Sequence, residues 1–219
     1  YASLFSGLRS DLASLRFLKV IAITEDGLQT LPFFPNLYDL ELNYTDFDPL
    51  PTLHLLQERT NTIQTLTIFR LPSGEVADAL SAKLSGWPSF KKLQGPTSIT
   101  PTRAAHLAVH PKFTEMGLGT GARVLEGSLP LLKNLVSVGF NGTQPPAILR
   151  EITQLPNVRR ITLDLEKLSV ADIPDFSPCK AVTEINLDNT PSPAAEVIAK
   201  CTGITGMKIF KLGHTQIEP

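Results

Sequence analysis

The sequence predicts an α/β solenoid: about nine parallel strands line a concave face, and short helices or turns form the convex face. Three observations predict this fold class. A short pattern, apolar-x-x-apolar-x-apolar, occurs nine times, its middle residues are 22 to 27 positions apart, and prolines and helical apolar spacings fall between the copies. The nine triplets are Leu15/Leu18/Val20, Leu37/Leu40/Leu42, Ile63/Leu66/Ile68, Phe90/Leu93/Gly95, Phe113/Met116/Leu118, Leu135/Val138/Phe140, Val158/Ile161/Leu163, Val182/Ile185/Leu187 and Ile204/Met207/Ile209.

Each triplet suits a short strand entered from a turn. Its second and third members share one face, because side chains alternate along a strand. One such strand cannot bury that face alone, so successive copies must stack into a parallel sheet with a continuous core. We therefore expect strands centred near residues 18, 40, 66, 93, 116, 138, 161, 185 and 207.

The segments between the triplets return the chain behind the sheet. Residues 76–84, 148–155 and 194–201 carry apolar side chains at helical spacing, and each run follows proline-containing turn residues. Most of the 18 prolines fall in such connections, where a missing N–H breaks no strand ladder. These segments are expected to form short convex-face helices.

Composition agrees with one folded domain over residues 1–219, which we expect to be a fragment of a longer solenoid or multidomain protein. The chain is 42% hydrophobic, with a mean hydropathy of +0.05. A net charge of −1 gives no electrostatic support for nucleic-acid binding, and no apolar run is long enough for a membrane span. The sequence leaves the oligomeric state open.

The chain resembles leucine-rich-repeat proteins, whose strands follow the pattern L-x-x-L-x-L-x-x-N. Residues 37–45 and 182–190 carry this pattern, and residues 201–209 are similar to the ribonuclease-inhibitor-like and cysteine-containing subtypes. The final asparagine is replaced by Thr45, Ser98, Thr143 and Thr190 in four repeats. Hydroxyl groups can satisfy turn backbone there, but a continuous asparagine ladder cannot form.

The two cysteines, Cys179 and Cys201, are one repeat apart, in a position that is mostly apolar in the other repeats. We expect two buried, reduced thiols rather than a disulfide or a metal site. The resemblance implies disulfide-rich caps in extracellular members, so their absence favours a cytoplasmic location. His110 occupies the same position, which predicts a structural histidine.

No residue constellation indicates catalysis or a cofactor. The glycines of residues 117–121 alternate within an expected strand and lack the lysine of a phosphate-binding loop. Two glycosylation sequons begin at Asn43 and Asn141, but the repeat pattern itself generates such pairs. We therefore expect a protein that is not an enzyme, with no cofactor and no bound metal.

The outward-facing strand positions are the remaining candidates for function. Exposed aromatic residues often anchor interfaces, and glycine within a strand often marks the close approach of another molecule. The expected partner-binding residues are Phe69, Gly117, Gly119, Gly139, Arg160 and Phe210.

The resemblance implies a protein–protein interaction module that binds another protein on its concave sheet. The alternative is a targeting or substrate-recognition domain of a larger enzyme, such as a kinase or a ubiquitin ligase. A purely structural spacer is a third reading. The identity of the partner does not follow from the sequence.

Overall fold

The computed structural model describes residues 14–21, 35–43, 62–69, 74–95 and 98–213. In these residues nine strands form one sheet, in the order in which they occur in the chain, and every neighbouring pair is parallel. The strands are β1 (Phe17–Ile21), β2 (Asp39–Asn43), β3 (Thr65–Phe69), β4 (Lys92–Gly95), β5 (Glu115–Leu118), β6 (Ser137–Phe140), β7 (Arg160–Asp164), β8 (Glu184–Asp188) and β9 (Ile209–Gly213).

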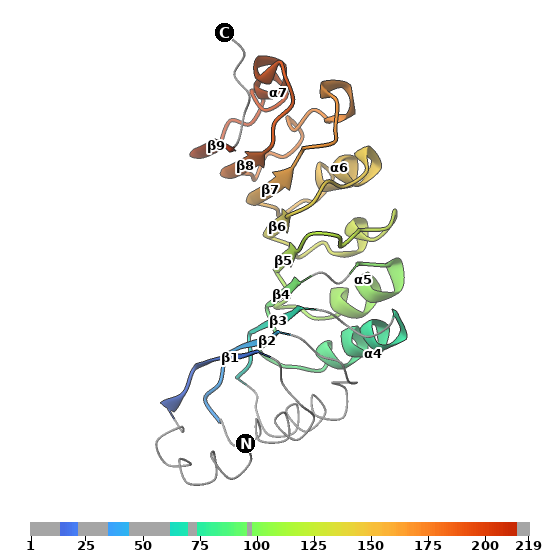
Figure 1. The fold of residues 1–219 in the computed structure, drawn as a ribbon, viewed down its shortest axis with the longest axis vertical. Helices are drawn as coiled ribbons and strands as arrows, with labels where there is room; N and C mark the ends of the chain where they lie inside the picture. Colours follow the sequence, from blue (N-terminus) through green and yellow to red (C-terminus); the bar gives the residue numbers. More distant parts are fainter. Residues whose placement is uncertain (1–13, 22–34, 44–61, 70–73, 96–97, 214–219) are drawn as a thin grey trace.

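Helical segments lie on the convex side of the sheet, opposite its concave face (Figure 1). They are α4 (Gly74–Leu84), α5 (Pro101–Ala108), α6 (Pro146–Ile152) and α7 (Ala194–Ala199), with short 3-10 turns at Leu129–Leu131 and Val170–Asp172. Three of the four helices match the expected segments. The fourth, α5, was not expected, although Thr100 accepts a hydrogen bond from the Arg103 N–H as its N-cap and Pro101 begins the helix.

A continuous apolar core fills the space between sheet and helices. The inward members of the triplets are buried along the stack; Leu66, Met116, Ile161 and Ile185, for example, are at most 2% exposed. Polar strand positions alternate with them, so β4, β5, β6 and β8 each alternate between half-buried and buried residues. This alternation gives the sheet one apolar face and one face open to a partner.

The ninth strand differs from the expected register. Ile185 pairs with Phe210 and Leu187 with Leu212, so the inward residues of β9 are Phe210 and Leu212 rather than Met207 and Ile209. Met207, Phe210 and Leu212 all pack against the core. The expected strand centre near residue 207 was therefore wrong by a few residues, because residues 204–212 contain two overlapping matches to the same apolar pattern.

Polar side chains in the turns replace an asparagine ladder. The Ser98 hydroxyl accepts a hydrogen bond from the Arg123 N–H at 3.1 Å, and the Thr190 hydroxyl donates to the Leu187 carbonyl at 3.4 Å. Buried Gln144 accepts from the Val124 N–H at 3.0 Å and donates to the Ala122 carbonyl at 2.9 Å. Ser98 and Gln144 thus connect neighbouring repeats, whereas Thr190 satisfies a backbone carbonyl of its own turn.

Candidate functional site

A hollow of about 460 Å³ lies on the outward face of the sheet, over strands β3 to β8. Gly117 and Gly139 line it and face each other in register on β5 and β6. Gly119, the residue after β5, and Arg160 of β7 also line it. The structure therefore brings together four of the six predicted partner-binding residues.

The two strand glycines leave open space rather than meeting a backbone requirement. A Cβ atom at Gly139 would have the Thr162 Cβ at 3.7 Å as its nearest neighbour, and one at Gly117 would lie 3.4 Å from side-chain atoms of Gln94. Gly95 differs, because its φ of +138° is unfavourable for other residues and a Cβ atom there would collide with the Ile68 carbonyl oxygen. Gly117 and Gly139 therefore form a floor without side chains, which we call the glycine floor.

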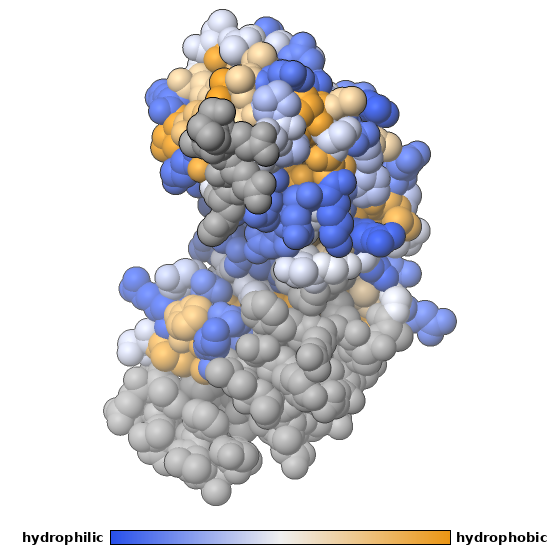
Figure 2. All heavy atoms as spheres, turned by 45° about the horizontal axis from the view of Figure 1, so that its top comes forward, coloured by the Kyte–Doolittle hydropathy of each residue, from blue (hydrophilic) through white to orange (hydrophobic). Residues whose placement is uncertain are grey.

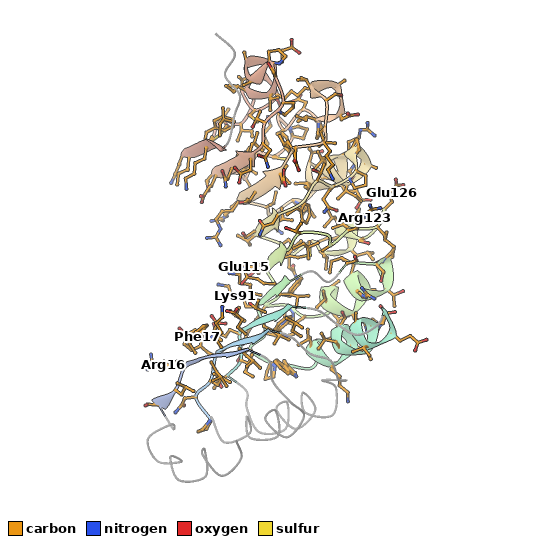
Figure 3. The ribbon with its side chains drawn as sticks, viewed as in Figure 1. Arg16, Phe17, Lys91, Glu115, Arg123 and Glu126 are labelled. Atoms are coloured by element: carbon orange, nitrogen blue, oxygen red, sulfur yellow. The ribbon has the colours of Figure 1, made fainter. Side chains whose placement is uncertain are left out.

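Charged side chains border the glycine floor on one side. Lys92, Glu115, Ser137, Arg160 and Glu184 follow one another in register across β4 to β8. The Glu115 carboxylate lies 3.0 Å from the Lys91 ammonium and 3.5 Å from the Arg160 guanidinium, which reaches over the small Ser137. Lys91 and Glu115 project from the sheet side of the molecule, opposite Arg123 and Glu126 on the helical side (Figure 3).

Uncharged polar groups line the remainder of the hollow. Gln94 lies beside Gly117, and its Oε1 accepts a hydrogen bond from the Thr67 hydroxyl at 3.2 Å. Thr162 is adjacent to Gly139 on the other side, and exposed Asn141 follows β6. Farther along the face, partial burial raises the pKa of Asp39, while the Lys92 charge opposes that rise. The site thus offers amides, hydroxyls and charges of both signs.

The two predicted aromatic anchors have different outcomes. Phe69 ends β3 and pairs with Asn43. Its side chain lies outside the described part of the structure, so its role as an anchor stays a prediction. Phe210 was expected to face outward, and this orientation is wrong, because it pairs with inward Ile185 and packs against the core. The large apolar residue of β9 that faces outward is Ile209, which is 42% exposed.

Sequence reasoning missed the ion-pair arrangement around Glu115. Lys91 immediately precedes β4, so its side chain is not in the outward strand set from which candidates were drawn. The signal that was available is the row of charges at equivalent repeat positions, Lys92, Glu115, Arg160 and Glu184. On parallel strands in register, such residues become lateral neighbours about 4.8 Å apart.

The titratable groups expected to be structural have structural surroundings. Cys179 and Cys201 are buried and free, as predicted, and burial raises the pKa of each thiol to about 11. Buried His110 contacts the Trp87 carbonyl through Nε2, and its Nδ1 accepts a hydrogen bond from the Lys112 N–H at 3.2 Å. Both ring nitrogens are therefore satisfied within the core.

The described residues contain neither a metal-binding cluster nor a membrane-spanning helix. No group of three or more histidine, cysteine, aspartate or glutamate side chains there is arranged to hold a metal ion. No helix in the same residues is long and apolar enough to cross a membrane. In the view of Figure 2, hydrophilic residues make up much of the described surface, with apolar residues interspersed among them.

Solved structures with the same arrangement of strands identify the fold. Internalin C2 from Listeria monocytogenes str. 4b F2365 is similar with a TM-score of 0.55 and 20% identity, over 93% of this chain and 83% of the internalin chain. The chain is a leucine-rich-repeat solenoid. TLR13 in its complex with ssRNA13 is similar with the same TM-score of 0.55 and 14% identity, over 94% of the solenoid but 37% of the TLR13 chain. No protein-family model matches the solenoid, and no curated protein matches it in sequence.

Proposed function

We propose that the solenoid is a non-catalytic protein-interaction module that binds its partner on the concave sheet, centred on the glycine floor. The observation that supports this proposal is the hollow of about 460 Å³ in the middle of that face. Two adjacent strands lack side chains there, while the strands on both sides carry them. A central recess bordered by polar groups suits an interface that concentrates its binding energy on one inserted anchor.

The lining of the hollow favours a protein over other classes of ligand. Its charged residues are two cations, Lys92 and Arg160, and two anions, Glu115 and Glu184. A nucleic-acid backbone requires an excess of cations, so the likeness to TLR13, which was solved with ssRNA, does not support RNA binding here. A small apolar ligand requires a mostly apolar enclosure. A protein surface can match both signs of charge and fill the recess.

Filling the glycine floor tests the proposal. Gly139→Arg should preserve the fold, because a Cβ atom at that position meets only an ordinary contact with Thr162. Gly206→Arg is the matched control: Gly206 is exposed in the connection before β9, and its Cβ atom would lie 3.5 Å from the Val182 carbonyl oxygen.

Tagged wild-type and variant solenoids would be used to recover partners from cells, and the affinity of each recovered partner would then be measured by titration calorimetry. We expect Gly139→Arg to weaken binding by at least about tenfold, whereas Gly206→Arg leaves the affinity unchanged. Equal affinities for the wild type and Gly139→Arg, with both variants folded by circular dichroism, would contradict binding at the glycine floor.

A further inference from the structure

The charges around the glycine floor specify the chemistry of its occupant, an inference that rests on the proposed function. Both anions of the bordering row have cations other than Lys92 and Arg160 beside them. Glu115 lies 3.0 Å from Lys91, and Glu184 lies 3.7 Å from Lys211. The Arg160 side chain is 49% exposed, and its guanidinium lies 3.5 Å from the Glu115 carboxylate, farther than the Lys91 ammonium at 3.0 Å. Lys92 and Arg160 are therefore the charges of this row best placed to meet a partner.

These two cations lie in the row beside the glycine floor, at a definite spacing from each other. Lys92 is on β4 and Arg160 on β7, and the floor glycines lie on the two strands between them. Three strand spacings of about 4.8 Å place the two cations roughly 14 Å apart. Residues i and i+4 of an extended peptide lie on one face and are separated by about 13–14 Å. The floor glycines are two residues farther along their strands than this row, and Glu115 and Ser137 lie directly between the two cations. A peptide crossing the strands above the glycines would place residue i+2 over the floor and residues i and i+4 over Gln94 and Thr162, toward which the long side chains of Lys92 and Arg160 extend from the neighbouring row.

We propose that the occupant is an extended segment of a partner protein with the pattern acidic-x-apolar-x-acidic. Its central aromatic or large aliphatic side chain rests on Gly117 and Gly139, and its two carboxylates face Lys92 and Arg160. Gln94 and Asn141 line the same hollow and provide side-chain amides for the peptide backbone. Such amides can both donate and accept hydrogen bonds, as an extended backbone requires.

Synthetic peptides test this proposal without an identified partner. The probe, blocked at both ends, carries two glutamates, a phenylalanine midway between them and serines at the intervening positions. One comparison peptide has lysines in place of the glutamates, and another has alanine in place of the phenylalanine. Binding of each labelled peptide to the whole solenoid would be measured by fluorescence anisotropy at low and raised salt.

The glutamate peptide should bind at least about tenfold more tightly than either comparison peptide, and raised salt should weaken it. Lys92→Glu combined with Arg160→Glu should reverse the preference, so that the lysine peptide binds better than the glutamate peptide. Arg123→Glu is the matched control, because Arg123 is exposed and lies on the helical side in Figure 3. It should leave the binding of all three peptides unchanged.

Three outcomes would overturn the proposed peptide chemistry: no binding of the glutamate peptide, equal binding of all peptides, or preference of the wild type for lysine. The calorimetric comparison of Gly139→Arg with Gly206→Arg separates this failure from failure of the proposed function. If Gly139→Arg still weakens the binding of a partner that lacks the acidic pattern, the concave face remains the binding surface. In that case only the proposed chemistry of the occupant is wrong.

Discussion

Glycine has two different roles at neighbouring positions of this solenoid. At Gly95 the φ of +138° and the nearby Ile68 carbonyl require the absence of a side chain, so a substitution would strain the backbone. At Gly117 and Gly139 the backbone imposes no such requirement, and a side chain would have room. The open space above these two glycines is why we place the partner's anchor there.

The buried thiols are expected to make the free energy of unfolding decrease at alkaline pH. Burial raises the pKa of Cys179 and Cys201 to about 11, whereas an unfolded cysteine titrates near 8.5. Below about pH 8.5 both states hold the thiol proton and the contribution to stability is complete. Between about pH 8.5 and 11 the unfolded state releases its proton first, so stability falls, by at most about 1.4 kcal/mol per pH unit for each thiol.

Urea unfolding between pH 8 and pH 10.5 would measure this slope. A Cys179→Ala/Cys201→Ala variant is the comparison, because it removes both thiols and keeps every other titratable group. The wild type should lose stability more steeply than the variant. Parallel slopes would show that the thiols are accessible to solvent in the folded state.

At the scale of single elements, the register of β9 is open to a direct test. Phe210 packs against the core while neighbouring Ile209 is 42% exposed. Phe210→Ala should lower the free energy of unfolding by about 1–3 kcal/mol, less than for a fully buried phenylalanine, because Phe210 is only partly buried. Ile209→Ala is the matched control and should cost no more than about 0.5 kcal/mol. Urea denaturation of both variants would measure these losses. A larger loss for Ile209→Ala than for Phe210→Ala would support the register in which Ile209 faces the core.

The strands show how far sequence periodicity determines the structure. For β1 to β8 each apolar triplet admits one register, and the strand positions were predicted correctly. In residues 204–212 two overlapping triplets compete, and the repeat spacing favoured the one that leaves Phe210 outside. The structure instead has the register that places Phe210 and Leu212 beside Ile185 and Leu187. Spacing alone does not weigh side-chain volume, and packing of the large aromatic residue decided the register.

The candidate site was predictable to a similar extent. Strand alternation alone places Gly117, Gly139 and Arg160 on one face, and the structure brings them to one hollow. The contact of Lys91 with Glu115 could not be predicted in this way, because it depends on the side-chain path of a residue outside the strand. Rotamers and ion-pair partners on an exposed face depend on three-dimensional neighbours rather than on the repeat period.

At the scale of the whole molecule, the stack of repeats fixes where the glycine floor can be. The nine strands follow one another in the sheet in chain order, so β5 and β6 have strands on both sides. The floor therefore lies in the interior of the concave face, with side chains of β4 and β7 as its walls. On the helical side, Arg123 and Glu126 project away from the sheet (Figure 3).

Site-specific photo-cross-linking tests binding on the concave face most directly. A benzophenone amino acid would replace Ser137, which lines the hollow, or Arg123 on the helical side. Each protein would be irradiated with its recovered partner, and the cross-linked products identified by mass spectrometry. We predict that the partner is cross-linked from position 137 and not from position 123. Cross-links from position 123 with none from position 137 would contradict the concave-face account.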